Sequence, residues 1–409
     1  MNKGAIKLWL KPELKQDKEG KKERIMHELF IGFTSITWQA IVMMLVGITL
    51  ITLAIKKEYE PMLLLPIGFG TILVNLPLSA VWAYEGEPGF LQLLFNAGIA
   101  TELFPVLIFV AVGAMCDFGP MFKNPVMMFF GAAAQFGIFA TVIFVLFLGN
   151  VVPGLEDFQS LKVAGAIGII GAADGPTSIF VASRFARDYL GPISVAAYSY
   201  MALVPLIQPP VIRLITSKKE RMIKMTAPAG DKDIPKSLKI CFPIVVTVIA
   251  GLVAPISVPL IGALMFGNLI RECGVLERLS MAAQNELANI VTILLGIAIG
   301  SCMQAEQFLK PATIMILALG LVAFVFDTAG GVFFAKLLNL FRKEKINPMI
   351  GAAGISAFPM SARVIQRMAT QEDPYNFVIM HSVSANVSGQ LGSVIAGGIV
   401  LALVPILMG

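Results

Sequence analysis

Long, uninterrupted runs of apolar residues recur along nearly the whole chain. Examples are "ITWQAIVMMLVGITLITLAI" (36–55), "VMMFFGAAAQFGIFATVIFVLFLG" (126–149) and "PATIMILALGLVAFVFDTAGGVFFAKLL" (311–338). A helix of about 20 apolar residues crosses the roughly 30 Å hydrocarbon layer of a bilayer, whereas the strands of a membrane barrel alternate in short segments. The pattern predicts an all-α polytopic membrane protein with about ten transmembrane helices.

Composition agrees with this class. Hydrophobic residues make up 57% of the 409 residues and charged residues 14%, whereas a soluble domain has roughly a quarter charged residues. The mean hydropathy is +0.81. The four cysteines lack the spacing of a metal site, and there are only two histidines, so neither a disulfide framework nor a zinc site is expected. We expect the chain to be surrounded by lipid and to have no nucleic-acid partner.

Polar stretches divide the chain. Residues 1–35 form a charged N-terminal surface segment, which is either an interfacial helix around "IKLWLK" or a solvated tail. Residues 217–239 form a basic polar loop, in which "MIKM" places Lys224 as an ordinary loop charge. The expected membrane halves are 36–216 and 240–409. The positive-inside tendency puts the N-terminal segment and the basic loop on the cytoplasmic side.

The two halves resemble each other in four short stretches that keep the same order. "PIGFGTILVN" (66–75) matches "PLIGALMFGN" (259–268), and "CDFGPMFKNP" (116–125) matches "CMQAEQFLKP" (302–311). "IGAA" occurs at 170 and again at 350. "YSYMAL" at 198 corresponds to "HSVSAN" at 381. Ordered matches at similar offsets indicate an internal duplication. They predict two inverted repeats whose broken helices meet at an ion site near the membrane midplane.

The first of these breaks contains a carboxylate. In "AIGIIGAADGPTSIF" (166–180), Asp174 precedes a glycine and a proline. A charge at the bilayer centre costs about 2.5–3.5 kcal/mol on insertion scales, and such residues usually face a cavity, a partner or an ion. The breakers free backbone carbonyls, and together these oxygens suit Na⁺ or proton exchange. The alternative is that Asp174 is only a helix N-cap.

The second half provides neutral oxygens. "KINPMIGAAGISAFPMSARV" (345–364) contains Asn347, Ser356 and Arg363 in apolar surroundings. "HSVSANVSGQLGSVIAGG" (381–398) adds neutral side chains, among them Asn386, Ser388, Gln390 and Ser393. Amides and hydroxyls with one carboxylate would hold a monovalent cation. Tight packing of small residues explains the serines and glycines equally well.

Other polar residues are weaker candidates. Tyr198 and Tyr200 serve either aromatic packing or a proton-bearing hydroxyl. Asp327, in "FVFDTAGG", is a second intramembrane acid without an adjacent proline. Glu102 and Asp117 flank one apolar segment and are expected at the membrane interface.

With these motifs in place, the chain resembles the β subunit of the biotin-dependent, sodium-translocating decarboxylases. The resemblance is carried by "GAADGPTSIF", "AAYSYMALVPLIQPPV", "FGNLIRECGVLERLS", "KINPMIGAAGISAFPMSARV" and "ANVSGQLGSVIAGG", and it extends from about residue 36 to the end. It implies a membrane ion pump that decarboxylates carboxybiotin, consumes a proton and exports Na⁺. It also implies that biotin is supplied by a separate carrier subunit.

The resemblance also implies residue roles and partners. The implied Na⁺ ligands are Asp174, Asn347, Gly351 and Asn386, and the implied catalytic residues are Tyr200, Ser356 and Arg363. The expected partners are a biotin carrier protein, a carboxyltransferase (α) subunit, a small membrane γ/δ subunit and further copies of this chain, in the bacterial cytoplasmic membrane. "SAN" (384–386) and "QLGS" (390–393) lean toward the acyl-CoA branch of the family rather than the oxaloacetate branch.

The residues alone leave a second function open. Paired breaks and one intramembrane acid equally suit a stand-alone secondary transporter, such as a Na⁺/H⁺ antiporter or a Na⁺-coupled carboxylate carrier. A purely structural membrane anchor fits poorly, because an anchor has no need of Asp174.

Overall fold

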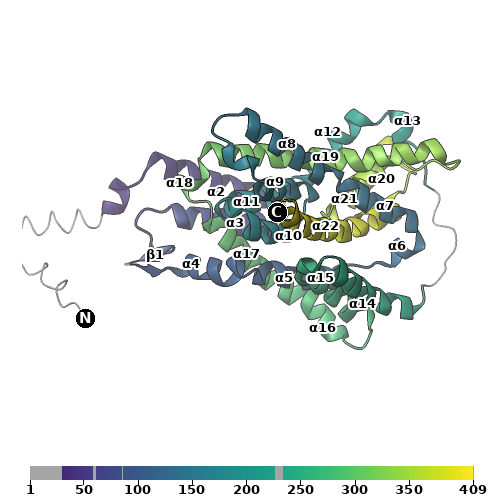
Figure 1. The fold of residues 1–409 in the computed structure, drawn as a ribbon, viewed down its shortest axis with the longest axis horizontal. Coiled ribbons are helices and arrows are strands. Elements are labelled where there is room, and N and C mark those ends of the chain that lie inside the picture. The colour runs from purple at the N-terminus through teal and green to yellow at the C-terminus, as the bar shows by residue number, and fades with distance from the viewer. Residues whose placement is uncertain (1–29, 59–60, 85, 226–233, 409) are drawn as a thin grey trace, which may run out of the picture.

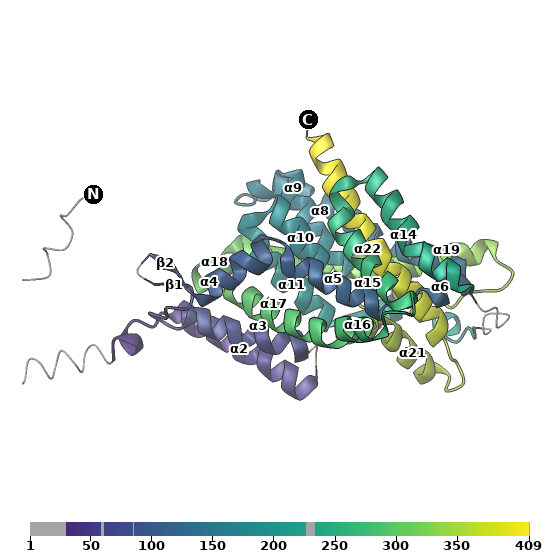
Figure 2. The same cartoon turned by 90° about the horizontal axis from the view of Figure 1, so that it is seen from below.

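The computed structural model describes residues 30–58, 61–84, 86–225 and 234–408, shown from two perpendicular directions in Figures 1 and 2. Regular structure in these residues is helical, apart from the short antiparallel pair β1 (Ala83–Tyr84) and β2 (Glu87–Pro88). The interfacial helix considered around "IKLWLK" lies outside the described residues.

The first half contains the following elements. They are α2 (Trp38–Lys57), α3 (Pro61–Asn75), α4 (Phe90–Phe95), η1 (Asn96–Ala100), α5 (Leu103–Met115), α6 (Gly119–Lys123), η2 (Pro125–Met127), α7 (Met128–Ala134), α8 (Phe136–Val151), η3 (Glu156–Gln159), α9 (Leu161–Gly168), η4 (Ile169–Ala172), α10 (Gly175–Phe185), η5 (Arg187–Tyr189), α11 (Leu190–Ala202) and α12 (Val204–Ile215).

The second half follows the basic loop. The loop itself contains α13 (Lys218–Arg221) and the first residues of α14. The elements of the second half are α14 (Lys236–Val253), η6 (Pro255–Ser257), α15 (Val258–Glu272), α16 (Glu277–Ala282), η7 (Ala283–Leu287), α17 (Ala288–Ser301), α18 (Ala305–Phe308), α19 (Pro311–Phe341), α20 (Met349–Ala352), α21 (Met360–Glu372) and α22 (Ile379–Leu407).

Within the described residues, six helices are long and apolar enough to cross a membrane, or up to eight if two bent pairs each count as one span. The bent pairs are α4–η1 with α5, at 59°, and η5–α11 with α12, at 71°. The predicted class, an all-α multi-pass protein with broken helices, is confirmed. The predicted number of about ten spans is not reached by length and composition, because α3 and α9–η4 are shorter than a full span.

The two halves repeat the same succession of elements. The hairpin α2–α3 corresponds to α14–α15, and α4–η1–α5 corresponds to α16–η7–α17, with a π-helical turn at η1 and again at η7. Next come the short α6 and α18, the long spans α7–α8 and α19, and a broken segment leading into α10 or α21. This order confirms the duplication that the four sequence matches predict.

The two halves also form a reciprocal pair of hydrogen bonds, as expected when an internal two-fold axis relates them. Asn75, at the end of α3, donates from Nδ2 to the carbonyl of Met303 after α17 (2.8 Å). Asn268, the matching residue of α15, donates from Nδ2 to the carbonyl of Cys116 after α5 (2.9 Å). The asparagines that end the first pair of matched stretches therefore secure the chain breaks that begin the second pair.

The apolar core has two main clusters, and the first helix break crosses from one to the other. Ile170 and Ala172 belong to the larger cluster, which also contains Phe109 and Phe180. Ala173 belongs to the second cluster, built largely around α19 and α20. Asp174 follows directly, so the fold places this carboxylate at the boundary between two packed units.

Candidate ion site between the two broken helices

The first break runs from η4 into α10. Ala173 adopts a left-handed conformation (φ 52°), which ends η4, and Asp174 is extended (φ −125°, ψ 95°) before α10 begins. The carboxyl Oδ1 of Asp174 accepts a hydrogen bond from the backbone N–H of Thr177 (3.2 Å). Pro176 fits in the first turn because the N–H it lacks has no partner within the helix there. Asp174 is therefore an N-cap, as the structural alternative proposed, and its second oxygen points elsewhere.

Gly175 lets an aromatic ring approach the start of α10. A Cβ at Gly175 would lie 2.3 Å from the ring of Tyr198, so any larger residue would displace that ring. Tyr198 is 2% exposed and lies on α11. The glycine next to Asp174 is thus required by close packing as well as by the helix break.

The second break runs from α20 to α21 and is bonded directly to the first. The backbone N–H of Ser356 donates to the carbonyl of Ala172 (3.0 Å). Asn386, on α22, donates from Nδ2 to the carbonyl of Ile355 (2.7 Å). The end of the first "IGAA" segment therefore meets the chain three residues after the second "IGAA" segment, which starts 180 residues later in the sequence.

The carboxylate of Asp174 is the centre of this meeting point. Its Oδ2 accepts hydrogen bonds from the hydroxyls of Ser356 (3.2 Å) and Ser393 (2.6 Å), and these two hydroxyl oxygens are 3.1 Å apart. Asp174 is 3% exposed, and no lysine or arginine in the described part of the chain forms an ion pair with it. A buried carboxylate with only neutral donors needs a cation or a proton to balance its charge.

Several oxygens near the breaks have no hydrogen-bond partner although they are buried. They are Thr177 Oγ1, Tyr198 Oη and Asn386 Oδ1. Buried polar atoms normally have a hydrogen-bond partner, so these unpaired oxygens indicate a bound group that the protein itself does not supply. One carboxylate with amide and hydroxyl oxygens is a hard, singly charged donor set, which suits Na⁺ and is unsuited to soft metals.

A cavity of about 310 Å³ adjoins the carboxylate. One wall consists of apolar residues from α3, α5 and α17, such as Leu63, Phe109 and Leu295. The rest of the lining includes Asp174 to Pro176 and Ser356 to Met360 of the two breaks. The cavity beside the candidate site is thus lined by helices of both halves, α3 and α5 from the first and α17 from the second.

The structure does not bring all the predicted residues to this site. Tyr200 donates its hydroxyl to the carbonyl of Leu317 on α19, and it is Tyr198 that lines the cavity. Arg363 is exposed on α21, contrary to the apolar surroundings expected for it. The reason is that α21 is amphipathic, with residues such as Val364 and Ile365 buried on its other face.

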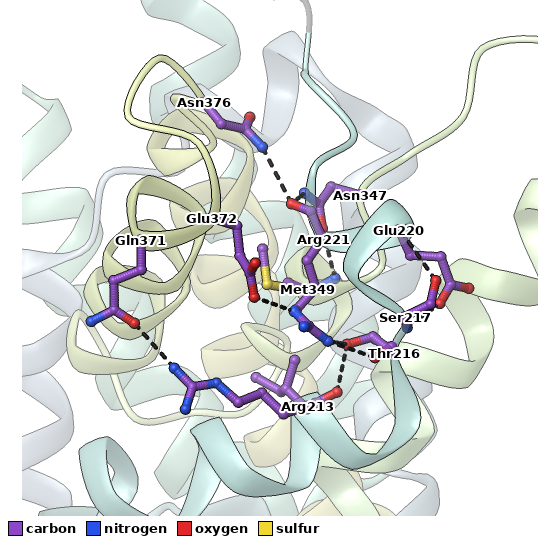
Figure 3. A network of polar contacts seen from close by, with 11 residues as sticks. Arg213, Thr216, Ser217, Glu220, Arg221, Asn347, Met349, Gln371, Glu372 and Asn376 are labelled. Carbon is purple, nitrogen blue, oxygen red and sulfur yellow. Dashed lines mark hydrogen bonds and ion pairs between the residues drawn. The ribbon is translucent and has the colours of Figure 1, made fainter.

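Asn347 lies in a separate polar network, which Figure 3 shows from close by. Its Nδ2 donates to the carbonyls of Arg221 (2.8 Å) and Ile223 (3.0 Å), and Asn376 reaches the same two carbonyls from the other side. Met349 donates its N–H to Asn347 Oδ1 (3.1 Å). Asn347 therefore fixes the start of the basic loop to the segment that precedes the second break.

Ion pairs add to this network at the C-terminal end of α21. Arg221 pairs with Glu372 (2.7 Å), and Lys224 pairs with Asp373 (3.0 Å). The pKa of Asp373 is lowered because the backbone N–H of Tyr375 donates to the carboxylate and Lys224 adds a positive charge. Lys224, expected to be an ordinary loop charge, thus forms one of the two ion pairs that hold the loop on α21.

Gly351 allows α20 to cross α19 in close contact. A Cβ at Gly351 would lie 2.0 Å from the carbonyl oxygen of Gly331. The next residue, Ala352, offers its carbonyl to Gln208 Nε2 (2.8 Å) and to the hydroxyl of Ser361 (3.2 Å). These contacts hold the beginning of the second break against α12 and α19.

In the sequence, Ser393 is only one of several candidate neutral oxygens, and Gln208 is not among the candidates. Ser393 stands among several serines of α22, and Ser388 looks equivalent in the sequence, yet its hydroxyl bonds to the carbonyl of Met127. Gln208 does not lie next to either helix break in the sequence, and its neighbours there are apolar residues and prolines. The signal available for Gln208 was an amide side chain within an apolar segment, which indicates a buried polar contact. For Ser393, only the way α22 packs decides that this serine rather than another reaches Asp174.

The fold and this site define a class: a multi-pass helical membrane protein of two repeats with an acid at paired helix breaks. Comparison with known proteins identifies the family. The sequence profile of the Na⁺-transporting oxaloacetate decarboxylase beta subunit matches residues 39–404. The chain therefore belongs to this family of membrane decarboxylase subunits.

Individual relatives are similar over nearly their full length. The chain is 51% identical to the glutaconyl-CoA decarboxylase subunit beta of Acidaminococcus fermentans, covering 91% of this chain and 95% of the relative. It is 47% identical to the methylmalonyl-CoA decarboxylase subunit beta of Propionigenium modestum, covering 91% and 96%. It is 44% identical to a probable oxaloacetate decarboxylase beta chain of Vibrio cholerae, covering 90% and 96%.

Proposed function

We propose that this chain is the Na⁺-pumping subunit of a decarboxylase complex in the bacterial cytoplasmic membrane. It couples the decarboxylation of carboxybiotin, with consumption of a proton, to Na⁺ export. The observation that carries the proposal is the buried Asp174 carboxylate, which is held at paired helix breaks by neutral donors only and faces a cavity. Membership in a family of Na⁺-transporting decarboxylase subunits supports it.

The proposed Na⁺ ligands are Asp174 and Asn386, with backbone oxygens of the breaks. Asn386 Oδ1 is buried without a partner, while its Nδ2 is bonded one residue away from Ser356. Asn347 and Gly351 lie outside this donor set and are proposed to support it, because they fix the segment from which the second break begins. The donor set as a whole carries one negative charge, which one Na⁺ balances.

The serine hydroxyls on Asp174 give the exchange step a physical basis. Hydrogen bonds from Ser356 and Ser393 stabilise the ionised carboxylate, so that Na⁺ meets a charged ligand. A proton that reaches the same carboxylate removes its charge and weakens Na⁺ binding. Competition of one proton and one Na⁺ for Asp174 would link proton consumption to Na⁺ release.

The remaining predicted residues take the proton and substrate side of the cycle. Tyr200, Ser356 and Arg363 are proposed to move protons or to meet the carboxyl group delivered by the partner. Arg363 is exposed on α21 and can therefore contact an anionic group brought by another subunit. Moving each charge against 100 mV costs about 2.3 kcal/mol, so opening of the site must be tied to the exergonic loss of CO₂.

We propose an acyl-CoA as the substrate of the complex. The stretches "SAN" and "QLGS" favour the acyl-CoA branch of the family. The sequence identities support this, because they are 51% and 47% to the beta subunits of two acyl-CoA decarboxylases and 44% to the beta chain of a probable oxaloacetate decarboxylase. The partners are a biotin carrier, a carboxyltransferase α subunit and a small membrane γ/δ subunit, with further copies of this chain. Selection of the acyl group belongs to the carboxyltransferase.

The test is Na⁺ transport by the complete complex in proteoliposomes. We expect Na⁺ uptake only when the acyl-CoA is decarboxylated, and we expect Asp174→Asn to abolish both. Na⁺ flux by the purified chain without any partner would instead identify a stand-alone transporter. Decarboxylation that continues in Asp174→Asn with unchanged Na⁺ dependence would show that the site is elsewhere.

A further inference from the structure

Asp327 is a second buried carboxyl group, and the proposed Na⁺ site does not use it. It lies near the middle of the long helix α19, is 0% exposed, and neither of its carboxyl oxygens has a hydrogen-bond partner. Buried carboxyl groups are normally paired or hydrogen-bonded. An acid with neither kind of partner indicates that something not fixed in the protein neutralises it.

The groups around Asp327 cannot supply that charge. Helices α7 and α8, and the segments η4 and α20, contain no titratable side chain. The other described elements packed on α19 contribute Lys162, Tyr198, Tyr200, Arg213 and Glu306, and α19 itself contributes Lys336. Lys162 and Arg213 are exposed, Lys336 pairs with Glu220 (3.1 Å), and Tyr200 binds Leu317.

The packing at Asp327 leaves little room for a metal ion. A Cβ on Gly137 would lie 2.1 Å from Asp327 Oδ1, and a Cβ on Gly171 would lie 3.0 Å from Oδ2. Helix backbone thus approaches the carboxyl group from two sides. Na⁺ needs several oxygen ligands around it, whereas a proton needs no additional space, so the geometry favours a proton.

The position of Asp327 provides a reason for that proton to come and go. The carboxyl group lies beside the backbone N–H groups of Gly137 and Ile138, in the first turn of α8 where α7 ends. Backbone N–H dipoles next to the carboxyl group favour negative charge, while burial favours the neutral acid. Gly171, on the other side, lies in η4, three residues before Asp174. A shift of the first break would therefore change the balance between these opposing effects.

We propose that Asp327 is an exchangeable proton-binding site built into α19, separate from the Asp174 carboxylate. The proton enters on a carboxylate oxygen of Asp327 and leaves from it, with no other bond made or broken. Its place in a Na⁺ pumping cycle rests on the proposed function. The existence of the site does not, because proton occupancy can be measured without decarboxylation.

Infrared difference spectroscopy on the purified full-length chain tests this. We expect a C=O band of a protonated carboxyl group in the wild type that is lost reversibly as the pH rises and is unchanged by Na⁺. The band should be absent in Asp327→Asn, shifted in Asp327→Glu and retained in Asp174→Asn. Thr328→Val, which changes the adjacent buried side chain without touching a carboxyl group, is the matched control and should leave the band unaltered.

Three results would overturn the proposal. Absence of the band at every pH would show that Asp327 stays ionised. A band that persists throughout the pH range in which the protein remains folded would show a permanently protonated, structural acid. A band that decreases when Na⁺ is added, in Asp174→Asn as well as in the wild type, would make Asp327 a cation site. Failure of the proposed pump would show instead in the transport assay and would leave these spectra unchanged.

Discussion

The two helix breaks are matched in sequence but differ in the charge that they carry. The first supplies Asp174 and a proline, and its short linker leads at once into α10. The second, from Ala353 to Pro359, carries no charge and supplies the hydroxyl and the backbone N–H of Ser356. Duplication has thus produced a site with a single carboxylate, which is the charge that one monovalent cation or one proton balances.

The breaks also differ in how the broken helix is secured at its far end. Arg184, in the last turn of α10, binds both carboxylate oxygens of Glu102 (3.0 and 3.2 Å), which lies in the bend before α5. At the end of α21, Glu372 binds Arg221 of the basic loop. Each broken helix is therefore tied at its C-terminal end to a bent or looped segment, by an ion pair of opposite polarity. Movement of either helix requires its own ion pair to adapt.

The largest expected effect comes from removing the charge of the first break. Asp174→Asn keeps a good N-cap residue, so the fold should persist while the charged ligand is lost. We expect Na⁺-dependent decarboxylation to fall by about 100-fold or more, because loss of even a supporting partner of a metal ligand costs about 10–100-fold. Activity of the reconstituted complex against Na⁺ concentration measures this. Asp117→Asn, on a carboxylate that pairs with Lys239 (3.9 Å) and not with the serines of the breaks, should behave as the wild type.

Removing the hydroxyls that reach Asp174 should have a smaller effect. Hydrogen bonds to charged groups contribute about 1.5–3 kcal/mol, and about 1.4 kcal/mol is tenfold. Ser356→Ala and Ser393→Ala should each raise the KM for Na⁺ roughly tenfold, because the carboxylate becomes easier to protonate. Ser388→Ala, on the same helix as Ser393, is the control. An equal change in all three variants would mean that the serines only pack helices.

Filling the close crossing before the second break should destabilise the protein. In Gly351→Ala the new methyl group meets the carbonyl of Gly331, and overpacking of this kind costs about 1–3 kcal/mol. Thermal unfolding in detergent should show a lower Tm. Gly262→Ala, where the nearest atoms are 3.8 Å away, should not lower it. A wild-type Tm for Gly351→Ala would mean that α20 can move away from α19 freely.

Asn347→Ala separates support of the second break from direct ion binding. The variant loses the amide that holds the carbonyls of Arg221 and Ile223. We expect faster backbone hydrogen exchange in residues 217–225, with a change in the KM for Na⁺ smaller than that of Ser393→Ala. A larger rise in KM without faster exchange would place the amide among the Na⁺ ligands in another state of the pump.

The smallest effect is expected from the ion pair between Lys224 and Asp373. Because the pKa of Asp373 lies below its ordinary value of 3.8, the contact stabilises the loop above that value and is lost as the pH falls through the lowered pKa. Asp373→Asn should speed hydrogen exchange in residues 217–225 a few-fold at neutral pH. The difference from the wild type should vanish once acid has protonated Asp373. A difference that stays constant down to the lowest pH would exclude the ionised carboxylate as its cause.

Much of this protein follows from the sequence alone. Apolar runs long enough to cross a bilayer dictate membrane helices, because an unpaired backbone is too costly in lipid. Asp174 stands out because a carboxylate beside Gly175 and Pro176 has no place in an uninterrupted apolar helix. The ordered matches between the halves predict the paired breaks, and the reciprocal hydrogen bonds of Asn75 and Asn268 agree with those matches.

The tertiary structure decided which oxygens meet. Ser393 rather than Ser388, and Tyr198 rather than Tyr200, lie beside Asp174, because helix rotation and crossing angle select one face from several similar residues. Asn347 reaches the loop, and Arg363 lies on an exposed face, for the same reason. Local pattern determines where a helix forms and where it breaks. Contacts between residues nearly two hundred positions apart depend on how the two halves pack, which no local pattern encodes.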